Sequence, residues 1–378
     1  MRSVSVRFEF GFFCPFYQEG FMKLLSLSLM IVVIAFLVSP IFAQGEATVL
    51  FLMINPGARQ GGMGEAGVAI ADDPNAVYWN PAGLAFQYEN PETDKKFAGS
   101  LMHVQWLPQF NLSDLYYDFG AFRYHWEDIG MLGLGIQFIN YGENIQTDNT
   151  GAEVSRFNSN EVAVTGSYAL KLKHNLGVGV GLKFIYSNLS PGIFVDNEKR
   201  DGRGSTFAAD IGALYHPGFA KKLSLGFDIS NIGPKMTYIN KAQADPVPTN
   251  LRMGLAYRLL DSEYNKFTIV YDVNRLLVHR DAEKADGVLK AIFYSSWTDA
   301  SVIRRFTHSI GGEYWYTDLI ALRAGYFYED ENFGGRKFWT FGGGLRMSIV
   351  GVDFSYIYAS VEDHPLSDTM RFSLSFSL

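Results

Sequence analysis

The feature that most constrains the fold of this chain is a two-residue alternation of side chains that recurs from residue 96 to the end. In residues 176–184, for example, large apolar side chains occupy every second position, with glycines and a lysine between them. Successive side chains of a strand point to opposite faces, so this pattern predicts strands with one apolar face. We expect fourteen strands, at residues 96–107, 113–124, 129–141, 158–172, 175–188, 205–216, 221–232, 249–260, 266–276, 306–316, 319–328, 337–347, 349–359 and 368–378.

The connections between these strands alternate in length. Short ones are expected at residues 125–128, 173–174, 217–220, 261–265, 317–318 and 348. Long ones lie between them, at residues 142–157, 189–204, 233–248, 277–305, 329–336 and 360–367. Outer-membrane barrels have tight periplasmic turns and long external loops, whereas a soluble β-sandwich, the alternative, has no reason for this order. The sequence therefore predicts an all-β, transmembrane, antiparallel up-and-down barrel of about 14 strands (residues 96–378), with both termini periplasmic.

The beginning of the chain has the features of an export signal. Met22-Lys23 provides a charged start, residues 24–38 are mostly apolar, and Ala43 is a small residue for cleavage. Residues 22–43 are therefore interpreted as a signal peptide, and residues 1–21 as an upstream extension. An uncleaved membrane anchor is the alternative, since the apolar run is close to spanning length. The strand-rich sequence that follows favours cleavage.

Composition narrows the function classes. Without residues 1–43, which carry three basic and two acidic residues, the formal net charge changes from −7 to −8, which argues against a nucleic-acid partner. The only cysteine, Cys14, lies in the part that would be removed, so neither a disulfide nor a thiol metal site is expected.

Residues 44–95, ahead of the first strand, are rich in turn-forming residues. Five glycines lie between positions 57 and 67, and Asn80-Pro81-Ala82-Gly83 favours a further turn. A compact, turn-rich insert before a closed sheet predicts a plug inside the barrel. The residues assigned to this plug motif are Gly57, Arg59, Gly62, Gly64, Gly67, Asp72, Asp73, Asn80, Pro81 and Gly83.

Residues 62–67 also match the dinucleotide-binding pattern G-x-G-x-x-G. Such a site needs a helix that opens at the third glycine, so that its amide groups cradle the pyrophosphate. Only six residues separate Gly67 from Pro74, too few for that helix, so the match is interpreted as coincidental.

Several short phrases of the plug motif resemble the amino-terminal signature of the PorV/PorQ family, outer-membrane barrels related to the FadL transporters of hydrophobic compounds. They are Gly57-Ala58-Arg59, Gly62-Met63-Gly64, Ala69-Ile70-Ala71-Asp72-Asp73 and Trp79-Asn80-Pro81-Ala82-Gly83-Leu84. Residues 370–378 resemble the terminal recognition strand of outer-membrane barrels, although they end in leucine where an aromatic residue is more usual.

The resemblance implies two competing functions. PorV-like proteins serve type IX secretion, in which they associate with a large translocon and receive cargo that carries a carboxy-terminal sorting domain. FadL-like proteins instead admit long-chain hydrophobic compounds. The first two phrases favour PorV, the others are shared by both groups, and no motif separates PorV from PorQ. Residues 189–204 are polar, which favours secretion slightly, since a loop that gathers hydrophobic compounds should be apolar.

Charged residues on the polar strand faces are expected to point into the barrel, because a Lys or Arg facing lipid at mid-membrane costs ~2–4 kcal/mol. They are Asp118, Glu161, Lys183, Asp210, Asp228, Arg252, Arg258, Asp272, Glu313, Arg323, Arg346 and Asp353. Their mixed signs favour an ion-pair network that holds the plug over a selective pathway or ligand site.

No catalytic residue, metal ligand or cofactor is assigned. The seven histidines form no close pair, and the neighbours His308 and Ser309 would face opposite ways on a strand.

The longest connection, residues 277–305, places four apolar residues at helical spacing. Leu289, Ile292, Phe293 and Trp297 are thus a candidate partner-binding loop, or equally a helix packed on the barrel rim. The expected partners are outer-membrane lipid, with either a translocon and sorting domains or a hydrophobic ligand.

Overall fold

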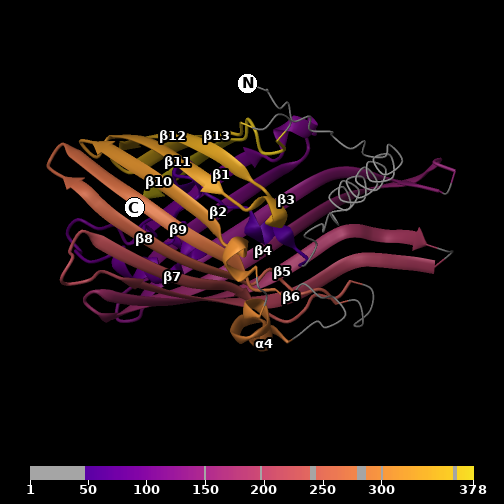
Figure 1. The fold of residues 1–378 in the computed structure, drawn as a ribbon, viewed down its shortest axis with the longest axis horizontal. Helices are drawn as coiled ribbons and strands as arrows, with labels where there is room; N and C mark the ends of the chain where they lie inside the picture. The colour runs from indigo at the N-terminus through magenta and orange to yellow at the C-terminus, as the bar shows by residue number, and fades with distance from the viewer. Residues whose placement is uncertain are drawn as a thin grey trace, which may run out of the picture. The chain divides into compact units, whose positions relative to one another are not determined.

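The strands of this protein form one closed antiparallel barrel (Figure 1). The computed structural model describes residues 47–148, 150–195, 198–238, 244–278, 287–298, 301–360 and 364–378. The predicted signal peptide and upstream extension lie outside these residues. Each strand pairs with its neighbours in sequence, and β14 pairs with β1 from Ala98–Ser377 to Val104–Arg371. The predicted fold class and the number of strands are confirmed.

The fourteen strands follow the predicted order. They are β1 (Phe97–Gln105), β2 (Tyr116–Trp126), β3 (Gly130–Thr147), β4 (Glu153–Lys173), β5 (Leu176–Val195), β6 (Glu198–Tyr215), β7 (Leu223–Ile232), β8 (Asn250–Asp261), β9 (Asn265–Leu276), β10 (Thr307–Tyr316), β11 (Ile320–Tyr328), β12 (Lys337–Met347), β13 (Val350–Tyr358) and β14 (Met370–Ser377).

Strand β5 shows why the alternation produces a barrel with an apolar exterior. Val180, Leu182 and Phe184 are exposed on its outer face, whereas Lys183 between them is buried on the inner face. Apolar side chains that face outward lie against lipid, and the charged one is kept in the lumen. None of the described helices is long and apolar enough to cross a membrane.

Two connections predicted as long loops are instead mostly strand. β3 and β4 continue as a hairpin to Thr147 and Glu153, and β5 and β6 continue to Val195 and Glu198. Figure 1 shows these four strands projecting beyond the others. The prediction of loops at 142–157 and 189–204 was wrong because it required apolar alternation. Backbone hydrogen bonds extend a hairpin beyond the membrane without that pattern.

The expectation that Asp118 points into the barrel was also wrong. On β2 the inner face carries Tyr117 and Phe119, which are buried against the segment before β1, so Asp118 faces outward. The rule that polar side chains face the lumen fails on this strand, because apolar side chains of that segment cover its inner face.

The other charged residues were expected to point inward as well. Arg258 lies at the exposed end of β8 beside Asp261, and Arg346 is partly buried. The remaining charged residues named above are buried inside the barrel: Glu161, Lys183, Asp210, Asp228, Arg252, Asp272, Glu313, Arg323 and Asp353.

The described chain begins and ends at opposite ends of the barrel. The Thr48 backbone N–H donates to the carbonyl of Pro246, in the long β7–β8 connection. Leu378 exchanges backbone hydrogen bonds with Phe97, at the end that carries the short turns. The periplasmic position of both termini stays a prediction, since residues 1–46 lie outside the described chain.

Cysteine labelling tests the orientation of the barrel. Ile303 and Phe219 are exposed to similar extents (82% and 88%), the first in the long β9–β10 connection and the second in the short β6–β7 connection. On intact cells an impermeant maleimide should label Ile303→Cys and spare Phe219→Cys, which should react only after lysis. Labelling of Phe219→Cys alone on intact cells would reverse the predicted orientation.

Candidate functional site

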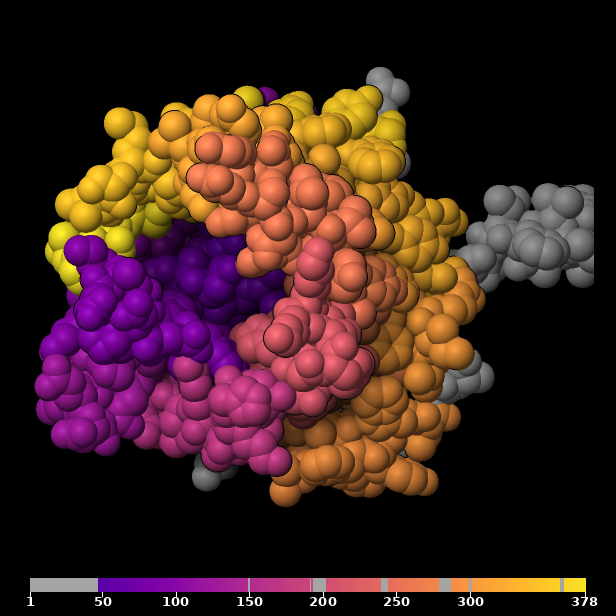
Figure 2. Space-filling model, turned by 90° about the vertical axis from the view of Figure 1, so that its left-hand side faces the viewer, coloured from indigo at the N-terminus to yellow at the C-terminus, as the bar shows by residue number. Residues whose placement is uncertain are grey.

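The N-terminal segment, defined as residues 48–87, lies within the ring of strands (Figure 2). It contains the short helices η1 (Leu50–Met53), α2 (Ala58–Gly61), α3 (Ala76–Trp79) and η2 (Pro81–Phe86). Seen from the end with the short turns, its atoms lie deep inside the surrounding strands.

Side chains on the inner face of the barrel accept hydrogen bonds from the backbone of this segment. The Ala58 N–H donates to Ser373 Oγ (2.9 Å), and the Gly64 N–H donates to Thr340 Oγ1 (2.7 Å). Asp272 Oδ2 accepts from the N–H groups of both Gly67 (2.6 Å) and Val68 (2.9 Å). The N–H of Ala58 is in the first turn of α2 and the other three lie in irregular structure, so none has a partner within a helix. Leaving such a buried donor unpaired would cost about 1–3 kcal/mol. The barrel wall therefore fixes the path of the segment.

An ion-pair network joins the segment to β10–β13. Arg59 binds Glu313 in a bidentate arrangement (Nε–Oε2 2.8 Å, Nη2–Oε1 2.9 Å) and also contacts Asp72 and Asp73. Arg323 donates to the same Glu313 (2.7 Å) and to Asp353 (2.8 Å). Buried charges are tolerated when each is paired and hydrogen-bonded. The predicted network of mixed sign is confirmed, and it includes the plug-motif residues Arg59, Asp72 and Asp73.

A second set of cationic contacts holds other parts of the segment. Arg371 Nη2 donates to Glu65 Oε1 (2.5 Å), and both residues are buried. Arg252 Nη1 donates to the Tyr78 carbonyl (2.9 Å), and its guanidinium lies 4.4 Å from the centroid of the Tyr78 ring. Glu65 was not among the predicted site residues, because its role depends on a partner about 300 residues away.

Asn80 and Pro81 attach the segment to β5 and β6. Asn80 Oδ1 caps η2 by accepting from the Ala82 N–H (3.1 Å), while Nδ2 donates to the carbonyls of Val68 and Ala213. Pro81 lies so close to β5 that a Cβ placed on Gly179 would be 2.4 Å from its carbonyl carbon. An inward glycine on the strand therefore leaves the space that the Asn-Pro turn occupies.

Glycines in the segment serve two different purposes. Gly57 and Gly64 have φ values of +91° and +69°, which L side chains rarely adopt. Gly83 does not need such a φ, but a Cβ there would lie 2.0 Å from the Ala71 carbonyl oxygen. Gly67 similarly packs against the Trp79 ring.

The G-x-G-x-x-G match at residues 62–67 has no phosphate-binding geometry. No helix opens at Gly67, and the Gly67 N–H donates to Asp272 instead.

Apolar side chains fill the space between the segment and the wall. Phe51 and Leu52 of the segment pack in one buried cluster with Tyr117, Ile139 and Ile185 of β2, β3 and β5. Each of these five side chains is at most 2% exposed. The interior is thus packed on this side like the core of a soluble protein.

The candidate partner-binding loop contains the short helix α4 (Val288–Phe293), as its spacing predicted. Ile292 is buried against Leu251 and Leu277, and the Trp297 ring stacks on the buried Arg275 at 4.4 Å. Leu289 and Phe293 are 68% and 77% exposed. The four residues therefore divide into two that are packed or partly covered and two that are exposed.

Among the described residues of this loop, the sequence pattern missed two further exposed side chains that are aromatic or apolar, Tyr294 (63%) and Ile303 (82%), which do not continue the helical spacing. Arg304 attaches the loop to the β11–β12 connection by two hydrogen bonds to Asp330, both of 3.0 Å. Chiefly through these bonds from Arg304, the pKa of Asp330 is lowered to about 2. The pair thus stays ionised at physiological pH. We name Leu289, Phe293, Tyr294 and Ile303 the rim patch.

Comparison with known proteins identifies related sequences and folds. The family model for "Type IX secretion system protein PorV" matches residues 44–283. The Ralstonia pickettii toluene transporter TbuX has a similar structure (TM-score 0.50, 13% identity, 86% of this chain and 98% of that chain). So has the Pseudomonas putida toluene transporter TodX (TM-score 0.50, 15% identity, 85% and 96%). At these identities the structural likeness concerns the fold alone. None of the curated protein sequences compared matches the chain.

Replacing Arg59 tests whether its ion pairs hold the segment in the barrel. Removing one partner of a buried pair typically costs about 3–5 kcal/mol, so Arg59→Gln should expose the segment to protease and lower the unfolding free energy by at least about 2 kcal/mol. The control is Arg156→Gln, which breaks the exposed pairs with Glu143 and Glu153 and should cost less than about 1 kcal/mol. Equal protease resistance of Arg59→Gln and the wild type would show that these ion pairs do not hold the segment.

Proposed function

This chain belongs to the PorV family of type IX secretion system proteins, and we propose that it receives cargo with a carboxy-terminal sorting domain at its external rim. The family and the barrel make it an outer-membrane protein of type IX secretion. Which proteins it contacts, and through which residues, is the subject of the proposal.

The packed interior is the observation that carries this proposal. The N-terminal segment and the inward side chains occupy the lumen, with Phe51, Leu52 and Tyr117 almost completely buried. A domain of 100 residues has a radius of gyration of about 13 Å, too large to share a fourteen-strand lumen with that segment. In this proposal the segment acts as a plug, and folded cargo binds outside the barrel.

The rim patch is the proposed recognition surface. Its four residues are large, exposed and apolar or aromatic, and they gather in one connection at the end opposite the short turns. Such a patch is stabilised when a partner covers it, and aromatic anchors of this kind dominate binding energy at interfaces. Ile292, Trp297 and the Arg304–Asp330 pair fix the loop on the barrel. The described part of the loop is thus attached to the barrel at several points.

The alternative is a FadL-like transporter of hydrophobic compounds, which the fold similarity to toluene transporters favours. A solute that crossed the lumen would have to displace the packed cluster around Phe51 and Leu52, or enter and leave through the wall. Passage of a solute across the lumen therefore requires the N-terminal segment to move, whereas reception of cargo at the rim does not.

Charged substitutions in the rim patch distinguish the two functions. Leu289→Asp combined with Phe293→Asp should abolish co-purification of translocon and cargo and leave the barrel heat-modifiable, since both side chains are exposed. Phe219→Asp, at an equally exposed apolar site on the short-turn end, should keep both partners. Slower uptake of a long-chain hydrophobic compound with unchanged secretion and partner binding would favour the transporter instead.

A further inference from the structure

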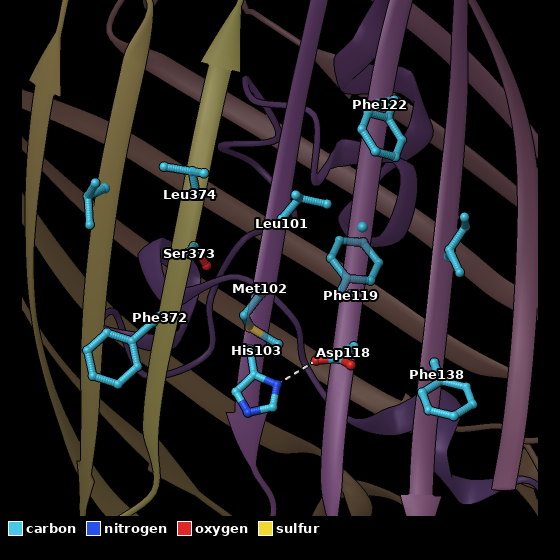
Figure 3. Close-up of a pocket in the computed structure, with 13 residues that line it drawn as sticks. Leu101, Met102, His103, Asp118, Phe119, Phe122, Phe138, Phe372, Ser373 and Leu374 are labelled. Atoms are coloured by element: carbon cyan, nitrogen blue, oxygen red, sulfur yellow. Dashed lines mark hydrogen bonds and ion pairs between the residues drawn. The ribbon is translucent and has the colours of Figure 1, made fainter.

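The outer wall of the barrel carries an apolar groove of about 600 Å³ where the sheet closes, across β14, β1, β2 and β3 (Figure 3). The outward apolar side chains that line it are Leu101, Phe122, Ile136, Phe138, Phe372 and Leu374, with Val352 of β13 beside Leu374. This face of a membrane barrel lies against acyl chains. The groove is therefore open to lipid.

A missing side chain creates the groove. The register places Leu374, Leu101, Gly120 and Ile136 side by side on consecutive strands. Only Gly120 in this row has no side chain, and a Cβ added there would come no closer than 3.4 Å to a neighbouring atom, Leu101 Cδ2. The neighbouring residues therefore leave the gap at Gly120 open.

The next row of outward residues contains an ionisable pair. His103 lies opposite Asp118, with Phe372 on one side and Phe138 on the other. His103 Nδ1 is 2.6 Å from Asp118 Oδ1, and the two side chains are 66% and 43% exposed (Figure 3). On the lipid face of a barrel, the cost of an ionisable residue falls from the membrane centre toward the interface, so such a pair is best tolerated near the head groups. This pair is not used by the N-terminal segment or the rim patch.

The depth and charge of the site indicate the kind of lipid. One row further lie the polar residues Gln105, Tyr116 and Asn140. β1 and β2 are joined there by residues 106–115, at the barrel end opposite the short turns, so the pair lies near head-group depth. Asp114 precedes β2 just beyond this row. The groove lining includes no Lys or Arg, and Asp118 Oδ2 has no hydrogen-bond partner among the described residues. A hydrogen-bond-donating cation complements such a site.

We propose that this groove seats one acyl chain of an amine-headed lipid of the outer membrane, whose ammonium group donates to Asp118. His103 holds the carboxylate by its hydrogen bond to Oδ1, and the chain fills the space above Gly120 between Leu101, Phe122 and Phe138. A carboxylate and an ammonium group form a charge-assisted hydrogen bond, which a quaternary choline or a glycerol head cannot reproduce. The site is independent of the proposed role in secretion.

Native mass spectrometry of the purified full-length mature barrel in detergent tests the site. With chain-matched phospholipids, the wild type should bind one phosphatidylethanolamine about tenfold more tightly than phosphatidylglycerol or phosphatidylcholine. Asp118→Leu should remove this preference and still bind lipid. Gly120→Leu should fill the groove and abolish the bound lipid. Its control, Gly166→Leu, places the same side chain on the outer face of β4, where nothing lies within 4 Å, and should bind like the wild type.

Three results would overturn the proposal. The first is unchanged lipid binding by Gly120→Leu, and the second is equal affinity of the wild type for the three phospholipids. The third concerns a protein occupant: a photo-crosslinker at Leu101 should capture lipid in intact membranes, and capture of a polypeptide there would mean that a partner covers the groove.

Discussion

Every backbone N–H and C=O group in the hydrocarbon layer must find a partner within the protein, and this constraint determines the rest of the structure. It requires β14 to pair with β1, since a free strand edge cannot face lipid. Closure then leaves a lumen, and its polar inner wall has to be satisfied in turn. The N-terminal segment does this through Asp272, Thr340 and Ser373, which accept hydrogen bonds from its backbone.

Charges inside the barrel and charges on its outer wall differ in how they are compensated. Inside the barrel, Arg59, Glu313, Arg323 and Asp353 compensate one another, so they stabilise the fit between segment and wall. Outside, Asp118 lies in an apolar surface and has His103 as its one side-chain partner within the described part of the chain. The rim patch and the His103–Asp118 pair take no part in this network. Both lie on surfaces that other molecules can reach.

The sequence predicted what depends on local pattern. Alternation revealed all fourteen strands, and the glycines and the Asn80-Pro81 turn revealed a compact segment before them. It did not predict contacts between distant residues, such as Glu65 with Arg371. It placed Asp118 inside because the apolar inner face of β2 depends on Phe51 and Leu52, which pack against it from another part of the chain. It also made four strands too short, ending β3 and β5 too early and beginning β4 and β6 too late, because hairpins outside the membrane need no apolar face.

The central claim is that the N-terminal segment stays inside the barrel while cargo is received outside. A disulfide can test it, since a Cβ on Gly61 would lie 2.8 Å from Ser355 Oγ, close enough for a bond between cysteines at these positions. The mature chain has no other cysteine if residues 1–43 are removed. Gly61→Cys combined with Ser355→Cys, once oxidised, should secrete cargo at the wild-type rate. Loss of secretion on oxidation and its recovery on reduction would contradict the account.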